Sequence, residues 1–459
     1  MSVINKTVLL VAVFFTALLM ISCGPDEAPL TIDQVGPPEW AYNSTIYEVN
    51  VRQFSEEGTF AKVEEALPRL QELGVEILWL MPIHPIGEKE RKGTMGSYYS
   101  VRDYFDVNPE FGSKDDFRSL VEATHEHGMK LILDWVANHT AWDNYLTETN
   151  PDFYVHDEDG NFIIPPGTDW DDVIQLDYDN PEVHNYMISA LRYWVEEFNI
   201  DGYRADVAYL VPTEFWERAR LELESIKNVF MLAEAEEPGL HPAFDMSYMW
   251  GGHHTMNGIA SGENTLADLD EYMDRIRNEF PETAFMMAFT SNHDENSWAE
   301  TEFNRLGDGV EAFGVLIFTK EAMPLLYNGQ ETGFNRMLEF FEKDPIDWDY
   351  DSPFQDFYAT LIDLKRTNTA LRNGHKGAPM ERLESSNDEA IYAFVRQNDE
   401  DRVVVVLNLS DDAQDVTISY GIEAGTYTDL FSGDEVTISE STDISFGTMD
   451  AWGYTVLVK

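Results

Sequence analysis

Short, mainly apolar runs alternate with amphipathic stretches along most of the chain. The apolar runs are typical of buried strands and lie at residues 45–51, 77–81, 131–137, 201–206, 229–233, 284–290 and 323–327. The amphipathic stretches predict helices at residues 60–73, 113–128, 183–198, 213–227, 266–279, 310–319 and 354–371. Strands without polar alternation, each followed by a helix, indicate a parallel sheet covered on both faces. About eight such units over this length favour an α/β fold, a closed (β/α)8 TIM barrel, over an open sheet.

Local signals mark the ends of the first two predicted helices. Ser113 and Asp116 have the spacing of a capping box, and Gly128 stands where their helix should end. Gly74 is expected to end the helix before it. Pro68, inside that earlier helix, predicts a kink or a short first half.

Two stretches depart from this rhythm. Residues 140–179 are rich in Asp, Asn, Pro and aromatic residues, which predicts a short loop domain after the third strand. Beyond residue 372 the apolar period changes to two, as in antiparallel strands, at residues 391–396, 403–409, 416–420, 426–431, 436–439 and 453–458. We therefore expect a barrel domain at residues 40–372 and a C-terminal antiparallel β-sandwich domain at residues 373–459.

Composition limits the classes of partner. Lys and Arg number 30 and Asp and Glu number 85 among 459 residues, so the formal net charge is −55. Such a surface repels nucleic acid and anionic lipids, and it suits a neutral ligand. Hydrophobic residues make up 43% of the chain, which is enough for a large core. The single cysteine, Cys23, excludes an intramolecular disulfide.

The N-terminus has the pattern of a bacterial lipoprotein signal. An apolar run at residues 7–21 follows Lys6 and ends in a lipobox-like sequence before Cys23. We expect residues 1–23 to be a signal peptide with lipidation at Cys23 after cleavage, and residues 24–39 to be a flexible tether. The protein would then be exported and lipid-anchored in the bacterial cell envelope, at the outer membrane or facing the periplasm, with no other membrane contact. An ordinary signal peptide or an uncleaved anchor is the alternative.

The run at residues 201–206 places charges in an apolar strand. Because side chains alternate along a strand, Arg204 and Asp206 share one face. Buried charges are costly unless paired, so the guanidinium should lower the pKa of Asp206 and keep it ionised. An ionised carboxylate suits a nucleophile, whereas a purely structural Arg–Asp pair is the alternative.

Further polar residues follow other predicted strands. Glu234 follows the apolar run at residues 229–233, and His293 and Asp294 follow the run at residues 284–290. In barrels of this kind the active site lies at the carboxyl ends of the strands, so these side chains should meet. Desolvation should raise the pKa of Glu234 and keep it protonated. Two carboxylates in different environments suit the cleavage of a glycosidic bond.

The order of these motifs resembles that of the α-amylase family of glycoside hydrolases. The patterns are D-x-x-x-N-H at residues 134–139, G-x-R-x-D at 202–206, a strand-end Glu, N-H-D at 292–294 and M-P-x-x-Y-x-G-x-E at 323–331. The resemblance covers nearly the whole chain after its N-terminus. It implies that Asp206 is the nucleophile, Glu234 the general acid/base and Asp294 the stabiliser of the transition state.

The same resemblance implies a role in substrate binding for four more residues. Arg204 would orient the nucleophile, His139 and His293 would hydrogen-bond hydroxyls of the reacting sugar, and Tyr99 would stack on it. Taken alone, Tyr99 is one of 21 tyrosines, and core packing is the alternative. No cofactor is needed for this chemistry.

Two departures from the family pattern bear on calcium and on substrate. Asn138 matches a family calcium ligand, whereas Gln175 stands where an Asp ligand is expected. Tyr209 and Leu210 replace a Lys-His pair that often follows the nucleophile motif. These departures argue against a tight structural calcium site, for which Asn138 remains the candidate ligand, and against a starch-amylase arrangement on the product side.

Two other groups of side chains could suggest a metal ion. His253 and His254 are adjacent, and adjacent histidines rarely chelate one ion, so we expect them in a loop. Asp347, Asp349 and Asp351 form an oxygen-rich cluster, but a solvated turn is the better interpretation in so acidic a chain.

The motifs support three hypotheses about function. The first is a retaining hydrolase that cleaves α-1,4-glucosidic bonds of starch or maltooligosaccharides through a covalent glycosyl-enzyme intermediate. The second is a transglycosylase or α-glucosidase of the same family. The third, from another class, is a catalytically inactive glucan-binding lipoprotein, against which the intact Asp206, Glu234 and Asp294 argue. The partner is in each case an α-glucan, and aromatic residues of the loop domain are expected to flank an open cleft.

Overall fold

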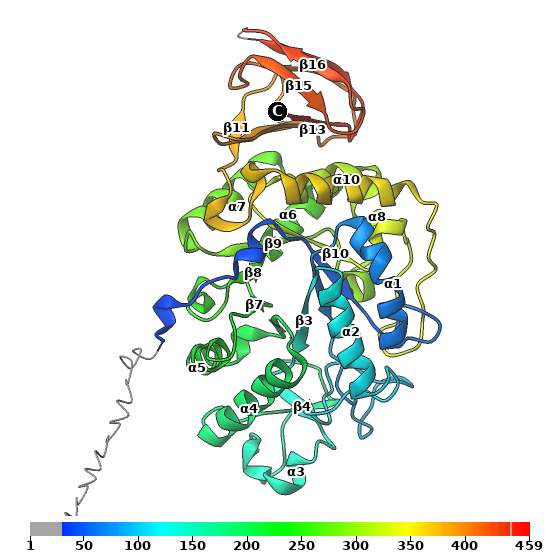
Figure 1. Ribbon diagram of the computed structural model, residues 1–459, viewed down its shortest axis with the longest axis vertical. Coiled ribbons are helices and arrows are strands. Elements are labelled where there is room, and N and C mark those ends of the chain that lie inside the picture. The colour runs from blue at the N-terminus through cyan, green and yellow to red at the C-terminus, as the bar shows by residue number, and fades with distance from the viewer. Residues whose placement is uncertain (1–29, 441–442) are drawn as a thin grey trace, which may run out of the picture.

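The computed structural model describes residues 30–440 and 443–459 and contains a closed barrel (Figure 1). Within these residues, eight parallel strands close in the order β1-β10-β9-β8-β7-β6-β3-β2. Their bounds are β1 Ile46–Val49, β2 Ile77–Leu80, β3 Lys130–Trp135, β6 Gly202–Ala205, β7 Phe230–Ala233, β8 Met246–Tyr248, β9 Phe285–Ala288 and β10 Met323–Tyr327. The predicted (β/α)8 barrel is therefore confirmed.

Helices follow most of the strands and cover the outside of the barrel (Figure 1). Their bounds are α1 Phe60–Leu73, α2 Lys114–Glu126, α4 Pro181–Phe198, α5 Thr213–Glu224, α6 Trp250–Ser261, α7 Leu266–Glu279, α8 Glu302–Leu306, α9 Val310–Thr319 and α10 Pro353–Thr367. The Asp116 N–H donates to the Ser113 hydroxyl at 3.2 Å, which confirms the predicted capping box. α1 runs through Pro68 in one piece, so the alternative of a short first half is wrong. It ends at Gly74, which has a left-handed φ of 95°.

Two elements of the barrel lack a clear sequence pattern. β8 is three residues long, which is too short to show an apolar period. α6 contains Gly251 and Gly252, which weaken a helical pattern, and it also contains His253 and His254. The prediction that these two histidines lie in a loop is therefore wrong. His253 is buried, and its Nε2 lies 2.9 Å from a carboxylate oxygen of Glu295.

The inside of the barrel is filled with apolar side chains. One buried cluster contains Ala41, Tyr42, Ile46, Ile77, Trp79, Ile132, Phe230, Leu232, Met246, Tyr248, Phe285, Met287, Phe289, Met323 and Leu325. Trp40 and Tyr42 precede β1 and pack against the first residues of β7 and β9, with ring centroids 5.7 and 5.1 Å apart. This packing closes the amino end of the barrel, so a ligand has to enter at the carboxyl end.

The C-terminal domain is antiparallel, as predicted. One sheet has the order β11-β12-β13-β18-β15-β16, and β14 pairs with β17. The strand bounds are β11 Glu381–Leu383, β12 Ile391–Gln397, β13 Arg402–Asn408, β14 Gln414–Ile418, β15 Gly425–Asp429, β16 Glu435–Ile438, β17 Ile444–Met449 and β18 Tyr454–Val458. Val404 of the larger sheet shares a buried cluster with Ile418 and Ile444 of the smaller one, so the two sheets pack face to face.

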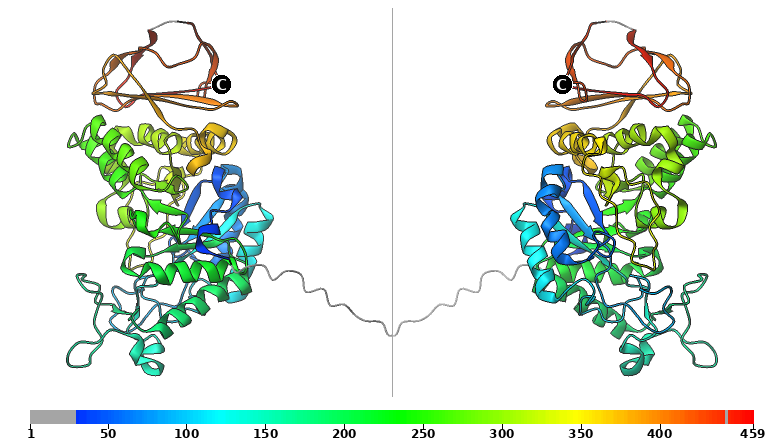
Figure 2. Two further views of the ribbon diagram at one scale, coloured as in Figure 1. Left: turned by 90° about the vertical axis from the view of Figure 1, so that its left-hand side faces the viewer. Right: turned by 90° about the vertical axis from the view of Figure 1, so that its right-hand side faces the viewer.

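The C-terminal domain and the loop domain lie at opposite ends of the molecule (Figures 1 and 2). The loop domain contains β4 His139–Ala141, α3 Leu146–Thr149 and β5 Val173–Gln175. At the other end, Arg396 of β12 is buried where the C-terminal sheets meet the barrel. Its guanidinium donates to the carbonyls of Lys320 at 2.7 Å and Ala378 at 2.8 Å. Burial lowers the pKa of Arg396 to about 10.

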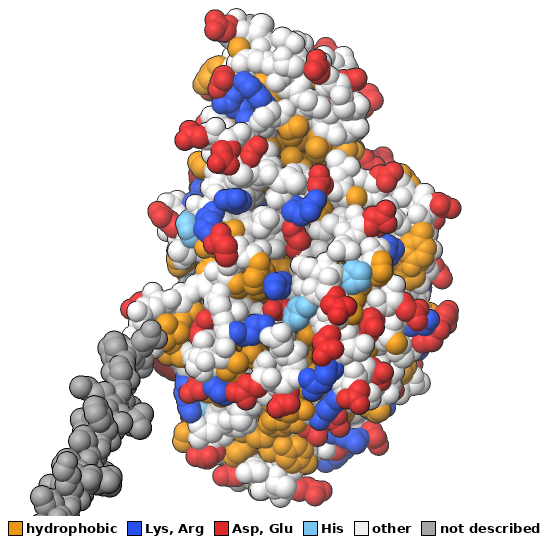
Figure 3. Space-filling model, viewed as in Figure 1, with side chains coloured by type: hydrophobic (Ala, Val, Ile, Leu, Met, Phe, Trp, Pro, Cys, Tyr) orange, Lys and Arg blue, Asp and Glu red, His pale blue; other side chains and the backbone are white. Residues whose placement is uncertain are grey.

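Charged side chains cover the surface of both domains. Figure 3 shows Asp and Glu spread over one face of the molecule, with fewer Lys and Arg between them. Among residues 30–440 and 443–459, no helix has the length and apolar character needed to cross a bilayer. The predicted signal peptide with Cys23 lies outside the described residues.

Candidate active site

A cavity of about 540 Å³ opens at the carboxyl ends of the barrel strands. The residues that line it include Lys92, Tyr99, His139, Trp170, Asp206, Val207, Glu234, His293, Asp294, Trp298, Phe340 and Phe341. All three predicted catalytic carboxylates and three of the four predicted sugar-binding residues are among them. The fourth, Arg204, is fully buried beside them.

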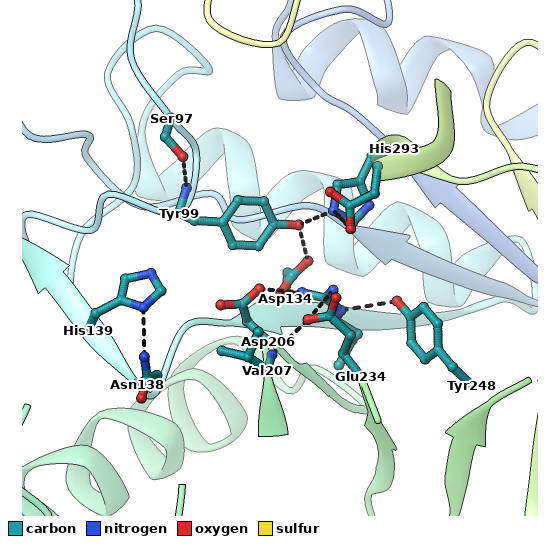
Figure 4. Close-up of polar contacts among 12 residues, drawn as sticks. Ser97, Tyr99, Asp134, Asn138, His139, Asp206, Val207, Glu234, Tyr248 and His293 are labelled. Carbon is teal, nitrogen blue, oxygen red and sulfur yellow. Dashed lines mark hydrogen bonds and ion pairs between the residues drawn. The ribbon is translucent and has the colours of Figure 1, made fainter. Parts of the chain in front are cut away.

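Arg204 of β6 contacts three carboxylates: Asp134 of the neighbouring β3, Asp206 directly after β6, and Glu234 directly after the neighbouring β7. Figure 4 shows these three carboxylates close together. Its Nη1 donates to Asp134 Oδ1 at 2.8 Å and to Asp206 Oδ1 at 3.0 Å. Its Nη2 lies 2.9 Å from Glu234 Oε2, as an ion pair without hydrogen-bond geometry. The pairing of β3 with β6 places Asp134 directly opposite Arg204. One guanidinium therefore compensates three negative charges only in part.

The pKa of Asp206 differs from the prediction. Burial raises it well above the usual range of an aspartate, the Glu234 carboxylate raises it further, and Arg204 opposes both effects. The predicted lowering is wrong because burial outweighs Arg204, whose positive charge is also shared with Asp134 and Glu234. The ligand-free site therefore favours a proton held among its carboxylates.

Glu234 directly follows β7 and is held by the backbone of Val207. The Val207 N–H donates to Glu234 Oε2 at 2.7 Å, and the same oxygen faces Arg204. Among the residues that the structure describes, Oε1 accepts no hydrogen bond, so it is the oxygen available to a ligand. Burial raises the pKa of Glu234 against the influence of Arg204, in agreement with the prediction. A protonated Glu234 can act as an acid toward a ligand oxygen.

Val207 has an unusual backbone conformation. Its φ of 37° and ψ of 48° are left-handed, which a β-branched residue rarely adopts. Such a conformation costs on the order of 1–3 kcal/mol. The preceding Asp206 N–H still donates to the Trp135 carbonyl at 2.9 Å, so the strain is local to Val207. The left-handed turn directs the Val207 N–H toward Glu234, and the backbone strain thereby fixes the position of that carboxyl group.

His293 lies between a buried carboxylate and the cavity. Its Nδ1 lies 2.5 Å from Glu48 Oε1, and its Nε2 lies 2.7 Å from the Tyr99 hydroxyl and 3.5 Å from Asp294 Oδ2. Burial alone would lower the pKa of His293, but the Asp294 and Glu48 carboxylates outweigh burial and raise it to about 9. His293 is therefore an imidazolium at neutral pH and donates from both ring nitrogens.

Tyr99 and His139 present rings and polar atoms to the cavity. The Tyr99 hydroxyl donates to Asp134 Oδ2 at 3.0 Å, and its ring lies at 22° to that of His293 with centroids 5.6 Å apart. His139 packs against Trp170, with centroids 5.5 Å apart. Burial lowers the pKa of His139 to about 4, so this ring is neutral at neutral pH. Ring faces beside polar groups suit the apolar face and the hydroxyls of a sugar.

The side chain of Asn138 contacts Gln175, the residue that replaces the expected calcium ligand. Gln175 Nε2 donates to Asn138 Oδ1 at 3.0 Å, to the Asn138 carbonyl at 3.1 Å and to the Leu176 carbonyl at 3.0 Å. Calcium binds such oxygens, but here an amide nitrogen takes the position between them. The residues around Asn138 therefore do not fit a calcium ion.

The described residues outside the surroundings of Asn138 do not form a metal site either. Within residues 30–440 and 443–459, no three His, Cys, Asp or Glu side chains are placed to hold a metal ion. Asp347, Asp349 and Asp351 are exposed ahead of α10, and the Asp351 N–H donates to Asp349 Oδ1 at 3.2 Å. This agrees with the predicted solvated turn.

Most aromatic residues of the loop domain pack the loop itself. Phe153 and Tyr154 are buried, and the Trp142 Nε1 donates to the Asp171 carbonyl at 2.9 Å. Of the aromatic residues at positions 140–179, all of which are described, Trp170 alone lines the cavity. The expectation that the loop's aromatic residues flank the cleft holds for this one residue, because the others stabilise a domain that has few regular elements.

Glu48, Trp79 and Tyr248 also belong to the site, although the motifs did not point to them. The Trp79 Nε1 donates to Asp134 Oδ2 at 3.3 Å, and the Tyr248 hydroxyl accepts from Arg204 Nε at 3.2 Å. A charge within the apolar strand β1 is the signal that could have identified Glu48. Trp79 and Tyr248 have no such signal, since their sequence context is that of ordinary core residues.

Two parts of the chain match known protein families. Residues 40–231 match the family model described as alpha amylase, catalytic domain. Residues 380–456 match the model described as maltogenic amylase, C-terminal domain. The two matches occur in the order of the barrel and the C-terminal sheets.

Solved structures share both parts. An α-amylase from Lactobacillus plantarum is 30% identical, with a TM-score of 0.81 over 92% of this chain and 99% of that one. The noncanonic maltogenic α-amylase AmyB from Thermotoga neapolitana is 29% identical, with a TM-score of 0.83 over 91% of this chain and 98% of that one. Among relatives by sequence, alpha-amylase MalA from Haloarcula japonica is 27% identical over 86% of this chain, and the match spans 59% of that protein's length. The chain therefore belongs to the α-amylase family of glycoside hydrolases.

Proposed function

We propose that the protein hydrolyses α-1,4-glucosidic bonds of starch or maltooligosaccharides and retains the α configuration in its products. The observation that carries the proposal is the placement of Asp206 and Glu234 on the two terminal nitrogens of Arg204. Carboxyl groups held by one guanidinium suit the short separation of a retaining enzyme, in which the second carboxylate attacks the sugar.

The reaction has two steps. Glu234 Oε1 gives its proton to the glycosidic oxygen while an Asp206 carboxylate oxygen attacks the anomeric carbon. The bond to the leaving sugar breaks, and an ester bond to Asp206 forms with inversion. Glu234 then takes a proton from a water molecule, whose oxygen attacks the same carbon and releases Asp206 with a second inversion. The proton returned to Glu234 resets the enzyme.

Charged groups around the reacting sugar stabilise its transition state. The Asp294 side chain is 35% exposed, so it can approach the sugar ring as positive charge develops there. The imidazolium of His293 can donate to a sugar hydroxyl, while neutral His139 can donate or accept. Tyr99 offers its ring face to the apolar face of the same sugar.

The names of the relatives support the substrate class. The relative from Thermotoga neapolitana is described as a maltogenic α-amylase, and the C-terminal match carries the same term. We therefore propose maltose and other short maltooligosaccharides as products. A net charge of −55 disfavours phosphorylated sugars as substrates.

Nuclear magnetic resonance of the first products, with chromatography over time, tests the proposal on maltooligosaccharides. We expect the α-anomer to appear first and short products to precede glucose. Initial release of the β-anomer would exclude retention. Glucose as the sole product from the earliest time point would exclude an open cleft, and longer transfer products would favour the transglycosylase.

We further propose an exported, lipid-anchored protein of the bacterial cell envelope, on the basis of the lipobox-like sequence before Cys23. Mass spectrometry of membrane-extracted protein should find an acylated N-terminal Cys23. Cys23→Ser should release the protein from the membrane fraction. A soluble mature form that starts elsewhere, and that this substitution does not change, would contradict the proposal.

A further inference from the structure

An aromatic cluster with one exposed member, Trp298, lies in the cavity of the catalytic carboxylates. Trp298 is 57% exposed, although most aromatic side chains of the barrel are buried. Its ring lies 5.1 Å from that of Phe340 and 5.7 Å from that of Phe341, centroid to centroid. All three residues line the same cavity as Asp294. A cluster of aromatic rings in the cavity of the catalytic carboxylates leaves apolar surface exposed unless a ligand covers it.

The segment that carries Trp298 is held in place. It is a π-helix at Glu295–Ala299, directly after Asp294, and such helices are rare and often found at functional sites. Its Asn296 is buried, and its side chain donates to the Arg336 carbonyl and accepts from the Leu338 N–H, both at 3.0 Å. These bonds tie the π-helix to the segment that leads into Phe340. The exposed ring is therefore presented by a fixed backbone.

The aromatic rings form a continuous strip that starts at Tyr99, beside the catalytic carboxylates. The Tyr99 ring lies at 10° to that of Phe340, with centroids 6.3 Å apart, and Phe340 in turn contacts Trp298. Tyr99 and His293 line the same cavity as Asp206, so under the proposed function they face the sugar that reacts with Asp206. The strip leaves this position through residues next to Asp294.

The position of the acid fixes the direction of the substrate. Glu234 has to reach the glycosidic oxygen, so the leaving sugar lies beyond Glu234. The strip instead lies beside Asp294 and His293. It is therefore on the side of the sugar that becomes attached to Asp206, and away from the leaving sugar. We propose that Trp298, supported by Phe340, stacks on a further glucose unit on this donor side of the cleaved bond. This inference rests on the proposed hydrolysis of α-glucans.

The test compares a one-ring with a multi-ring substrate. We expect Trp298→Ala to lower kcat/KM for maltotetraose, relative to that for α-glucosyl fluoride, by about five- to tenfold, mainly through KM. Trp298→Phe should restore most of the ratio, because it keeps an aromatic face. Tyr420→Ala is the matched control, since Tyr420 is 61% exposed in the C-terminal domain, and it should leave the ratio unchanged.

Maltotetraose labelled at its reducing end identifies the side. Loss of a donor-side contact should move cleavage toward the non-reducing end and lengthen the labelled product. An unchanged ratio in Trp298→Ala, an equal loss on both substrates, or a shorter labelled product would each overturn the inference while wild-type hydrolysis stands. A wild-type protein inactive on every α-glucan would instead overturn the proposed function on which the inference rests.

Discussion

Two polar clusters lie near the carboxyl end of β3, and they are built in opposite ways. Around Arg204, three carboxylates share one cation, so negative charge remains in excess. Around Gln175, one neutral amide donates to three oxygens, so no charge is present. The comparison shows that excess negative charge is found in the cavity, where a substrate can bind. Neutral hydrogen bonds are found where the loop domain is attached to the end of β3.

The largest effect is expected from removing the nucleophile of the charged cluster. Asp206→Ala should lower kcat/KM for maltotetraose by roughly 10⁴-fold or more, because the covalent route is lost. It also relieves a carboxylate whose pKa burial raises, so the protein should stay folded. Kinetics and circular dichroism melting measure both effects. Wild-type activity in this variant would remove Asp206 from its proposed role.

The second effect concerns the acid. Glu234→Gln should lower kcat/KM for maltotetraose by roughly 10²- to 10⁴-fold, because the leaving oxygen receives no proton. With α-maltosyl fluoride, whose leaving group needs no proton, formation of the glycosyl-enzyme should persist. A burst of fluoride release followed by slow turnover is the expected trace. Equal losses on both substrates would show that Glu234 acts through structure alone.

The third effect concerns the pH dependence that Glu48 imposes. The pKa of His293 is about 9, so kcat/KM should fall as the pH rises through 9 and the imidazolium loses its proton. In Glu48→Gln, Asp294 and the more distant Asp134 and Glu234 carboxylates still oppose burial, but the hydrogen-bonded carboxylate is lost, so the alkaline limb should move down by about one unit or more. Glu302→Gln is the matched control, because the buried Glu302 contacts Thr290 and Gln330 and not His293.

The same pair predicts how stability depends on pH. The folded pKa of His293, about 9, exceeds the ordinary value of 6.5. Its contribution is therefore fully present below about pH 6.5 and is lost as the pH rises toward 9. Melting temperatures of the wild type should decline over this window, and Glu48→Gln should show a shallower decline. An unchanged alkaline limb and an unchanged slope would show that Glu48 does not control His293.

The smallest effect is expected at the neutral cluster. Chelation should change the melting temperature of the wild type by no more than about one degree, since a bound ion is needed for a linkage effect. Gln175→Asp replaces the amide donor with a carboxylate beside the oxygens of Asn138. It should cost about 1–3 kcal/mol without metal and recover with added calcium. A wild type that melts many degrees lower after chelation and recovers with calcium would contradict this.

Much of the barrel and of the catalytic set could be predicted from sequence, because each signal was local. An apolar strand followed by a polar residue identifies the positions of Glu234 and Asp294, and the alternation of β6 places Arg204 beside Asp206. The geometry of parallel strand ends then brings these residues together.

The remaining features depend on contacts between distant segments. Glu48 of β1 meets His293, which follows β9, because barrel closure leaves only β10 between these two strands. The pKa of Asp206 depends on how deeply it is buried and on the Asp134 and Glu234 carboxylates that share Arg204, and both carboxylates come from other segments of the chain. The short β8 carries Tyr248 to Arg204, yet three residues hold too little pattern to be recognised.

Arg396 of the C-terminal domain is bonded to the barrel domain across their junction. Its guanidinium makes its contacts with backbone carbonyls, at Lys320 in the barrel domain and at Ala378 ahead of β11. If the C-terminal sheets detached, the buried guanidinium and the Lys320 carbonyl would lose each other as partners, whereas the contact with Ala378, inside the C-terminal domain, would remain. Because detachment alone would leave this buried cation without its partner in the barrel, we expect the C-terminal sheets to unfold together with the barrel and not before it.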